Sequence, residues 1–261
     1  MSTMPLPLAY AIGDVILLIA FVWLVLAGLW AVVMTPILRQ GPGGAASLGV
    51  AWRLSRWWLR YRQRMTHEGL QHLESAMQSP KVIIIANHTG GVDPLLIQAA
   101  TPRHIRWMMA ADMMPPGTQD IWDWVGVIPV HRDHADPAAM RMALRLIRQG
   151  CPLGVFPEGR ITRPPGSLRP FLEGAALLAQ RTGATVLPCW ISGTPDVDSM
   201  AGSLLGRSAS RVVFLEPVTY DRSMAAADVA EDLRQRLAEA SGWPCVDEPM
   251  PLILSGPTDS P

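Results

Sequence analysis

Residues 81–93 read Lys-Val-Ile-Ile-Ile-Ala-Asn-His-Thr-Gly-Gly-Val-Asp, and this stretch decides how the chain folds. Lys81–Ala86 is a short apolar run rich in β-branched side chains, which is typical of a strand. Polar residues and two glycines follow it, and Pro94 then opens a predicted helix over 94–100. The stretch therefore predicts a strand, a loop and a helix in succession.

The same alternation continues along the chain. We predict further strands over 104–109, 126–131, 154–156, 185–191 and 211–215, and further helices over 137–149, 172–181 and 224–240. Strands separated by helices of about ten residues predict an α/β fold, with a mostly parallel central sheet flanked by helices, over residues 71–245. Reactive groups in such sheets lie on loops that leave the carboxyl ends of strands. Residues 246–261 are rich in Pro, Ser and Asp, and we expect a loose tail.

Composition narrows the class of protein. Of 261 residues, 49% are hydrophobic and only 17% are charged, against roughly 25% charged in an ordinary soluble domain. The 22 basic residues balance the 22 acidic ones, which argues against a general nucleic-acid surface. Cys151, Cys189 and Cys245 are far apart and odd in number, so neither a disulfide framework nor a zinc ribbon is expected.

The N-terminal residues 1–40 are expected to form a hydrophobic membrane helix. Val15–Leu38 contains 24 consecutive uncharged residues. As a helix this run is about 36 Å long, enough to cross a hydrocarbon core of roughly 30 Å. A cleaved signal peptide would have basic residues before a shorter apolar run, yet no Lys or Arg precedes Arg39. A buried core helix is a further alternative, which the lack of a polar face disfavours. Whether the helix crosses the bilayer or stays in one leaflet is left open.

Residues 41–70 are expected to hold a second, amphipathic helix, roughly over 46–65, that lies at the membrane interface. Its aromatic and basic side chains are Trp52, Arg53, Arg56, Trp57, Trp58, Arg60, Tyr61, Arg62 and Arg64. Such rings and guanidinium groups belong at the level of the lipid headgroups. The alternative is a solvated basic face over an aromatic core stripe. The two helices predict an N-terminal membrane-associated hairpin, and the arginine excess places the rest of the chain on the cytoplasmic side of the inner membrane.

His88 and Asp93 are the candidate catalytic base and its partner. The glycines between them let the loop turn, so the Asp93 carboxylate can reach one imidazole nitrogen while the other nitrogen takes a proton. Alternatively, Asp93 before Pro94 is a good helix N-cap. The residues alone support both interpretations equally. No metal is expected here, because no third His or carboxylate follows at ligand spacing.

Two further predicted strands end in charged residues. The strand over 126–131 leads into Arg132, and Asp136 is expected to cap the next helix. The strand over 154–156 leads into Pro-Glu-Gly-Arg-Ile-Thr at 157–162, followed by Arg-Pro-Pro-Gly at 163–166, which has the composition of a surface turn. Arg132 and Arg160 can grip a phosphate, and Glu158 can accept hydrogen bonds from glycerol-type hydroxyls. Each of these, taken alone, is more often a solvated loop charge, but their position at consecutive strand ends, with His88 at another, favours a functional site.

Four blocks in this order resemble those of the glycerolipid acyltransferase family, over roughly residues 71–193. They are Asn-His-x4-Asp at 87–93, Gly-Val-Ile-Pro-Val-His-Arg at 126–132, Phe-Pro-Glu-Gly at 156–159 and Val-Leu-Pro at 186–188. The resemblance implies that His88 is the general base and Asp93 its partner, and that the segment around Pro188 helps to shape the acyl site. It also implies that Arg132, Glu158 and Gly159 bind the acceptor. Asn87, Arg160 and Thr162, which adjoin these residues in the sequence blocks, are expected to bind the acceptor as well.

The third block departs from the usual pattern of the family, which is Phe-Pro-Glu-Gly-Thr-Arg-Ser. Arg160 comes one place early, and Ile161 stands where the arginine is expected. The variant resembles the acyltransferase part of the bifunctional bacterial acyl-carrier-protein synthetase, which reacylates lysophosphatidylethanolamine. The acceptor headgroup is therefore open.

The resemblance implies an O-acyltransferase of phospholipid synthesis. It would move a fatty acyl group from a thioester, on coenzyme A or acyl-carrier protein, to the free hydroxyl of a lysophospholipid, with 1-acyl-glycerol-3-phosphate as the first candidate. No cofactor is expected beyond this donor, and the thioester needs no covalent acyl-enzyme, so Cys151 and Cys189 are expected to be ordinary buried thiols. Backbone N–H groups near Gly159 are candidates for stabilising the oxyanion.

The expected partners are the lysophospholipid, the acyl donor and the lipid bilayer, and no nucleic acid. Two other functions remain open: a lipid hydrolase or transacylase that uses the same base, and a non-catalytic membrane adaptor that keeps the fold.

Overall fold

The computed structural model describes residues 6–132, 135–197 and 199–247, with side chains from residue 13 onward. The chain divides into two compact units, Met1–Arg53 and Leu54–Pro261. The boundary falls inside the second helix, within the segment 41–70 that the sequence predicts to be interfacial. Most of the predicted tail, residues 248–261, lies outside the described residues.

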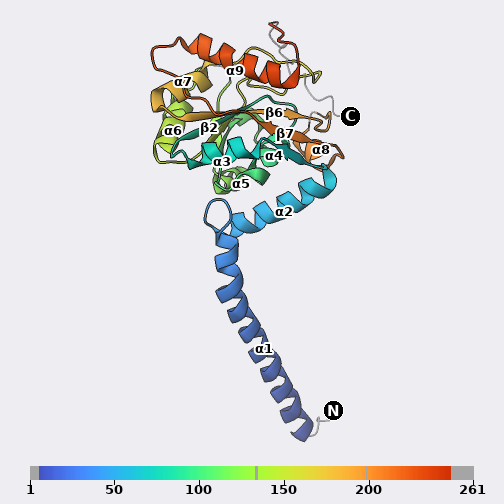
Figure 1. The fold of residues 1–261 in the computed structure, drawn as a ribbon. Helices are drawn as coiled ribbons and strands as arrows, with labels where there is room; N and C mark the ends of the chain where they lie inside the picture. The colour runs from blue at the N-terminus through green and yellow to red at the C-terminus, as the bar shows by residue number, and fades with distance from the viewer. Residues whose placement is uncertain (1–5, 133–134, 198, 248–261) are drawn as a thin grey trace. The chain divides into compact units, whose positions relative to one another are not determined.

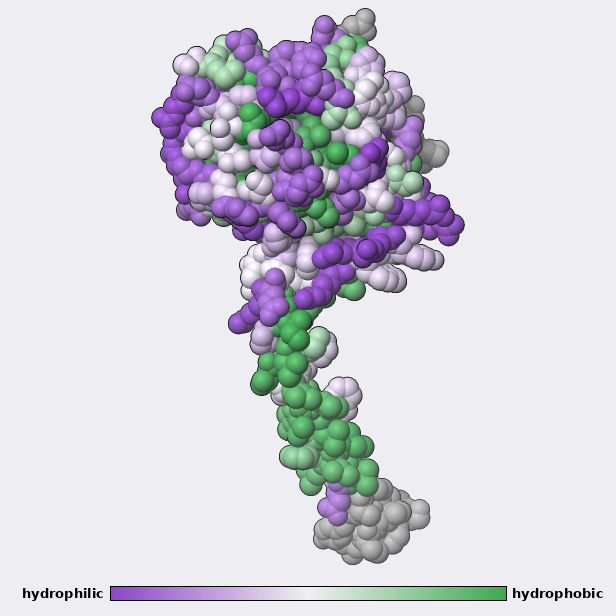
Figure 2. Space-filling model, viewed as in Figure 1, coloured by the Kyte–Doolittle hydropathy of each residue, from purple (hydrophilic) through white to green (hydrophobic). Residues whose placement is uncertain are grey.

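The first unit contains the long helix α1 (Leu6–Arg39) and the start of α2 (Ala46–Arg62). Gly13–Arg39 is long and apolar enough to cross a membrane, with none of its most apolar stretch buried in the protein; Figure 2 shows this surface as almost uniformly hydrophobic. The turn between the helices is tight, because a Cβ on Gly49 would lie 1.9 Å from the Leu38 carbonyl oxygen. The Arg53 guanidinium donates to the Ile37 carbonyl oxygen at 3.1 Å.

The second unit is built on a seven-stranded sheet with the order β1-β7-β6-β2-β5-β3-β4 (Figure 1). Every strand pairing is parallel except that of β6 with β7. The prediction of a mostly parallel α/β sheet is therefore confirmed. The strands are β1 (Thr66–Glu68), β2 (Val82–Ala86), β3 (Arg106–Ala110), β4 (Ile128–Val130), β5 (Leu153–Val155), β6 (Thr185–Ser192) and β7 (Arg211–Phe214).

Helices cover both faces of this sheet, as Figure 1 shows. One face carries α6 (Pro137–Arg148), α7 (Glu173–Thr182) and α9 (Ala226–Ser241); the other carries α3 (Leu70–Gln78) and α4 (Asp93–Ala100). Strand β2 is buried throughout. Its Ile83 and Ile85 pack into the first core and its Val82, Ile84 and Ala86 into the second, because successive side chains of a strand point to opposite faces.

Several element boundaries differ from the prediction. Strand β4 begins at Ile128 rather than 126, because Gly126 ends helix α5 (Gln119–Val125) in the left-handed conformation, with φ 75°. The short elements β1, α3 and α5 and the six-residue α8 (Met200–Leu205) were not predicted. They are too short or too polar to show a clear hydrophobic period. The N-cap prediction for Asp136 is confirmed, since its carboxylate accepts from the Ala138 and Ala139 amides.

The C-terminal half of α2 belongs to the second core, which yields a stability prediction. Leu59 is fully buried there, whereas Leu54 is 61% exposed on the same helix. We expect Leu59→Ala to lower the free energy of unfolding by about 2–5 kcal/mol, because it removes buried methyl groups and leaves a cavity. Leu54→Ala is the matched control and should change it by less than about 0.5 kcal/mol. Denaturation of both full-length variants in the same detergent measures the difference; equal losses would contradict this packing.

Candidate active site

The loop after β2 brings His88 and Asp93 together. His88 Nδ1 lies 2.9 Å from Asp93 Oδ2, with 18% of the imidazole side chain and none of the carboxylate exposed. No other described residue is recorded as a partner of the second ring nitrogen, Nε2. The arrangement leaves one nitrogen held inside the protein and the other available to a substrate.

The Asp93 carboxylate is held by its own loop. Its Oδ2 accepts from the backbone N–H of Thr89 at 2.6 Å and of Gly90 at 2.9 Å, and its Oδ1 accepts from the Thr89 hydroxyl at 3.2 Å. The helix cap position is Val92, and Asp93 is the first residue of α4. The side chain therefore folds back onto the loop and does not cap the helix.

These contacts determine which nitrogen of the imidazole carries the hydrogen. An oxygen that already accepts two backbone N–H groups is the acceptor toward His88, so Nδ1 carries the hydrogen and donates it. Nε2 then has a free lone pair in the neutral ring. That is the protonation state which a general base requires.

Two aromatic rings fix the plane of the imidazole. The His88 ring stacks on Phe156 at a centroid distance of 4.1 Å, and Phe156 stacks on Trp107 at 4.9 Å, with 12° between the planes in both pairs. Gly154 allows the buried indole to lie against the sheet, since a Cβ there would be 2.4 Å from the Trp107 ring. The sequence did not predict these contacts for Phe156 and Trp107. The position of Phe156 at a strand end, next to Glu158, was the available signal.

Glu158 organises the loops and does not face an open site. Its Oε1 accepts from the His88 backbone N–H at 2.8 Å, and its Oε2 accepts from the Arg169 N–H at 3.2 Å and from the Thr162 hydroxyl. Burial raises the pKa of this carboxyl group, against the hydrogen bonds, which lower it. Thr162 is buried, and its backbone N–H donates to the His88 carbonyl oxygen at 2.9 Å. Both residues thus bind the protein itself in this structure, and their contacts with an acceptor stay a prediction.

Gly159 has a φ of 70°, in the region that favours glycine. Its backbone N–H donates to the Phe156 carbonyl oxygen at 3.0 Å. That donor is therefore used within the turn, and stabilisation of an oxyanion stays a prediction for the other backbone N–H groups of this loop.

Asn87 and Pro188 also lie inside the protein. The Asn87 amide donates to the Ile191 carbonyl oxygen at 2.9 Å and accepts from the Ile191 N–H at 2.7 Å, which fastens the end of β2 to β6. Because the side chain is buried and both its amide groups are used, Asn87 does not present itself to an acceptor. Pro188 is buried in β6 opposite Ile85, in the middle of the sheet.

Arg132 and Arg160 are the sequence-predicted site residues that remain open to a ligand. Arg132 pairs with Asp112, an exposed carboxylate whose pKa this hydrogen bond lowers, and the charge of Arg160 adds to the shift. Arg160 itself has no recorded bond to another described residue. Arg132, Arg160 and Asp112 together carry a net charge of +1.

Residues 163–166 form a turn with exposed prolines, as predicted, and Arg163 makes contacts from it that were not predicted. Its guanidinium donates to the Thr89 carbonyl oxygen at 2.7 Å and to that of Val197 at 2.9 Å, and it pairs with Asp196 at 3.3 Å. It therefore fastens the third sequence block to the loop that carries His88. Of the thiols, Cys189 is buried as expected, whereas Cys151 is only half-buried.

Comparison with known proteins finds similarity to acyltransferases over the residues that form this site. Residues 64–192 match the family described as Acyltransferase. The chain is 30% identical over 124 residues to a 1-acyl-sn-glycerol-3-phosphate acyltransferase of Borreliella burgdorferi, covering 46% of this chain and 49% of that one. It is 24% identical over 178 residues to the chloroplastic 1-acyl-sn-glycerol-3-phosphate acyltransferase BAT2 of Brassica napus, covering 66% and 49%. The chain thus spans about half the length of these relatives.

The fold has a counterpart among solved structures. The 1-acyl-sn-glycerophosphate (LPA) acyltransferase PlsC of Thermotoga maritima superposes with a TM-score of 0.57 at 18% identity, covering 76% of this chain and 81% of that chain. The sheet and the sequence match together define an α/β fold in which residues 64–192 match the family described as Acyltransferase. The family match over residues 64–192 and these relatives support the resemblance to glycerolipid acyltransferases that the four sequence blocks carry.

The placement of Asn87 predicts a structural role that can be measured. Asn87→Ala leaves the buried N–H and C=O of Ile191 without partners, and each unpaired group costs about 1–3 kcal/mol. We expect a lower unfolding midpoint in thermal denaturation, with the acceptor KM of the remaining folded enzyme unchanged. If the variant instead has a raised acceptor KM and an unchanged unfolding midpoint, Asn87 binds the acceptor and the structural role is wrong.

Proposed function

We propose that the protein is an O-acyltransferase that moves a fatty acyl group from an acyl thioester to the free hydroxyl of a lysophospholipid. The observation that carries the proposal is the 2.9 Å contact of His88 with Asp93, which leaves Nε2 free. The named relatives, which act on 1-acyl-sn-glycerol-3-phosphate by their descriptions, support the same class of acceptor.

The reaction follows from the held imidazole. Nε2 of His88 takes the proton of the acceptor hydroxyl as its oxygen attacks the thioester carbonyl, and the buried Asp93 carboxylate stabilises the imidazolium. The tetrahedral intermediate then collapses, the C–S bond breaks, and the thiolate leaves and takes the proton from Nε2. Such base catalysis contributes about 10²–10⁴ in rate.

Arg132 and Arg160 are proposed to hold the acceptor phosphate. A charge-assisted bond from guanidinium to phosphate is strong and directional. Arg132 already forms an ion pair with Asp112, so the phosphate must either share the guanidinium group with this carboxylate or displace it. The first candidate is 1-acyl-glycerol-3-phosphate. The Arg160-Ile161 order and a carboxylate beside the arginines favour lysophosphatidylethanolamine as the second, because Asp112 can accept from its ammonium group.

We further propose that the donor is acyl-CoA or acyl-carrier protein and that the active site works on the cytoplasmic side of the inner membrane. The apolar α1, whose most apolar stretch is not buried in the protein, supports attachment to a bilayer. The arginines that come after it in the sequence support the orientation.

Replacing the base tests the proposal directly. We expect His88→Ala to reduce acyl transfer by at least about 10²-fold, when the purified full-length protein receives labelled acyl donor and a panel of lysolipids with different headgroups. His72→Ala on α3 is the matched control and should keep normal turnover. Membrane association should be unchanged in both. Normal turnover of the His88 variant would remove this residue from the mechanism, and acyl release without lysolipid would indicate a hydrolase.

The arginines give a second, independent test. Arg132→Gln and Arg160→Gln should each raise the acceptor KM about tenfold, since a hydrogen bond to a charged group is worth about 1.5–3 kcal/mol, and should leave the donor KM nearly unchanged. Arg141→Gln, on the exposed side of α6, controls for the loss of one positive charge. If the variants raised the donor KM and the acceptor KM equally, Arg132 and Arg160 would not be specific to the acceptor phosphate.

A further inference from the structure

A second cluster of arginines lies outside the catalytic loop, where α2 ends. Tyr61, Arg62, Arg64, Arg207, Ser208 and Ala209 line a hollow of about 420 Å³, within the size range of ligand sites. Arg64 and Arg207 are exposed. Within the described part of the chain, none of the three arginines forms an ion pair with a carboxylate, so the hollow carries three uncompensated positive charges.

The frame of this hollow is fixed by a buried glutamine. The Gln63 side chain donates to the carbonyl oxygens of Ser203 at 3.0 Å and Gly206 at 2.9 Å, and it accepts from the Ser208 hydroxyl. Arg62 Nε donates to the Leu205 carbonyl oxygen at 2.7 Å. The end of α2 and the segment 205–209 are thus held together as one rigid rim.

Exposed apolar side chains adjoin the charged rim. Trp57 is 65% and Tyr61 69% exposed, and their rings stack with centroids 6.1 Å apart. Leu54 and Leu205 are also mostly exposed. Arginines without partners beside exposed rings and leucines match the boundary of a bilayer, where phosphates lie above acyl chains.

We propose that this hollow binds the phosphate of an anionic membrane lipid, with Arg62, Arg64 and Arg207 on the phosphate and the Trp57–Tyr61 pair against the lipid. Guanidinium groups suit this role because they bind phosphate oxygens in pairs. The site takes a bilayer lipid and is separate from the acceptor arginines, Arg132 and Arg160.

The lipid site connects to the catalytic loop through Ser203. The Ser203 carbonyl oxygen accepts from Gln63, and its buried hydroxyl accepts from the Val92 backbone N–H at 3.1 Å. Val92 directly precedes Asp93. A lipid that steadies the rim therefore also steadies the loop that holds the His88 partner.

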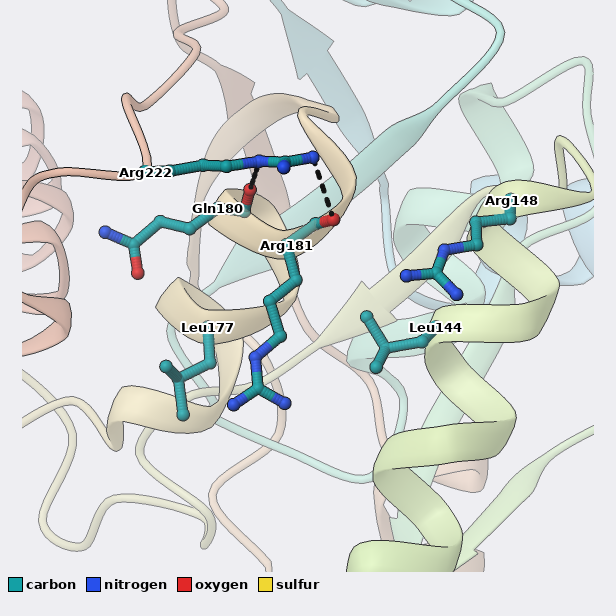
Figure 3. Close-up of a pocket in the computed structure, with 6 residues that line it drawn as sticks. All are labelled: Leu144, Arg148, Leu177, Gln180, Arg181 and Arg222. Carbon is teal, nitrogen blue, oxygen red and sulfur yellow. Dashed lines mark hydrogen bonds between the residues drawn. The ribbon is translucent and has the colours of Figure 1, made fainter.

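A second hollow lined by arginines serves as a control for positive charge alone. Figure 3 shows another hollow of about 490 Å³ with three arginines, Arg148, Arg181 and Arg222, over Leu144 and Leu177. Arg222 donates to the carbonyl oxygens of Gln180 and Arg181. No aromatic side chain lines this hollow, so it lacks the apolar part of a lipid site.

The test measures hydrogen exchange of the full-length protein in nanodiscs of phosphatidylcholine, with or without phosphatidylglycerol. We expect phosphatidylglycerol to slow exchange several-fold over residues 203–209 and at Val92. Arg64→Gln/Arg207→Gln should lose this protection, Arg64→Lys/Arg207→Lys should keep most of it, and Arg148→Gln/Arg181→Gln should keep all of it.

Three results would overturn the proposal. The first is that phosphatidylglycerol leaves hydrogen exchange of the wild-type protein unchanged, and the second is that Arg148→Gln/Arg181→Gln loses as much protection as Arg64→Gln/Arg207→Gln. The third is that inorganic phosphate gives the same protection in phosphatidylcholine discs. The last would indicate a site for free phosphate. Hydrogen exchange is measured without acyl transfer, so the result for the lipid site does not depend on whether the proposed catalytic function is correct.

Discussion

The contact between Asp93 and His88 is the interaction on which the site depends. A buried carboxylate is costly unless hydrogen bonds satisfy it, and here two backbone N–H groups and a hydroxyl from residues 89 and 90 do so. The same bonds make the carboxylate an acceptor toward the imidazole. The loop thus stabilises the charge and selects the useful tautomer with one set of contacts.

The other sequence blocks serve this loop more than they serve the substrate. Glu158 and Thr162 bind the main chain of His88, Arg163 binds that of Thr89, and the Phe156 ring fixes the imidazole plane. Asn87 fastens the strand that carries the loop. Positioning of this kind reduces the reorganisation that a reaction needs. The groups left open for a ligand, Nε2 and the arginines at 132 and 160, are few.

The sequence predicted the sheet well, because β2 and β6 are apolar runs bounded by turn residues. It also located the candidate base and partner, whose spacing across two glycines is local. It did not show that Arg163 turns inward or that Trp107 stacks behind Phe156, since these contacts join residues distant in sequence and leave no periodic pattern. Helix α8 escaped prediction because six residues show too little hydrophobic period. The backbone contacts of Asn87 and Glu158 were not predicted for a related reason: a polar side chain in a motif does not reveal whether it faces ligand or backbone.

The most direct test of the account is ¹⁵N NMR of the His88 imidazole in the full-length protein in micelles, with ¹⁵N-labelled histidine and His88→Ala used to assign the signal. The account predicts that the neutral ring carries its hydrogen on Nδ1 and leaves Nε2 bare, and that Asp93→Asn loses this preference. A ring that carries its hydrogen on Nε2, or one that does not respond to Asp93→Asn, would contradict it.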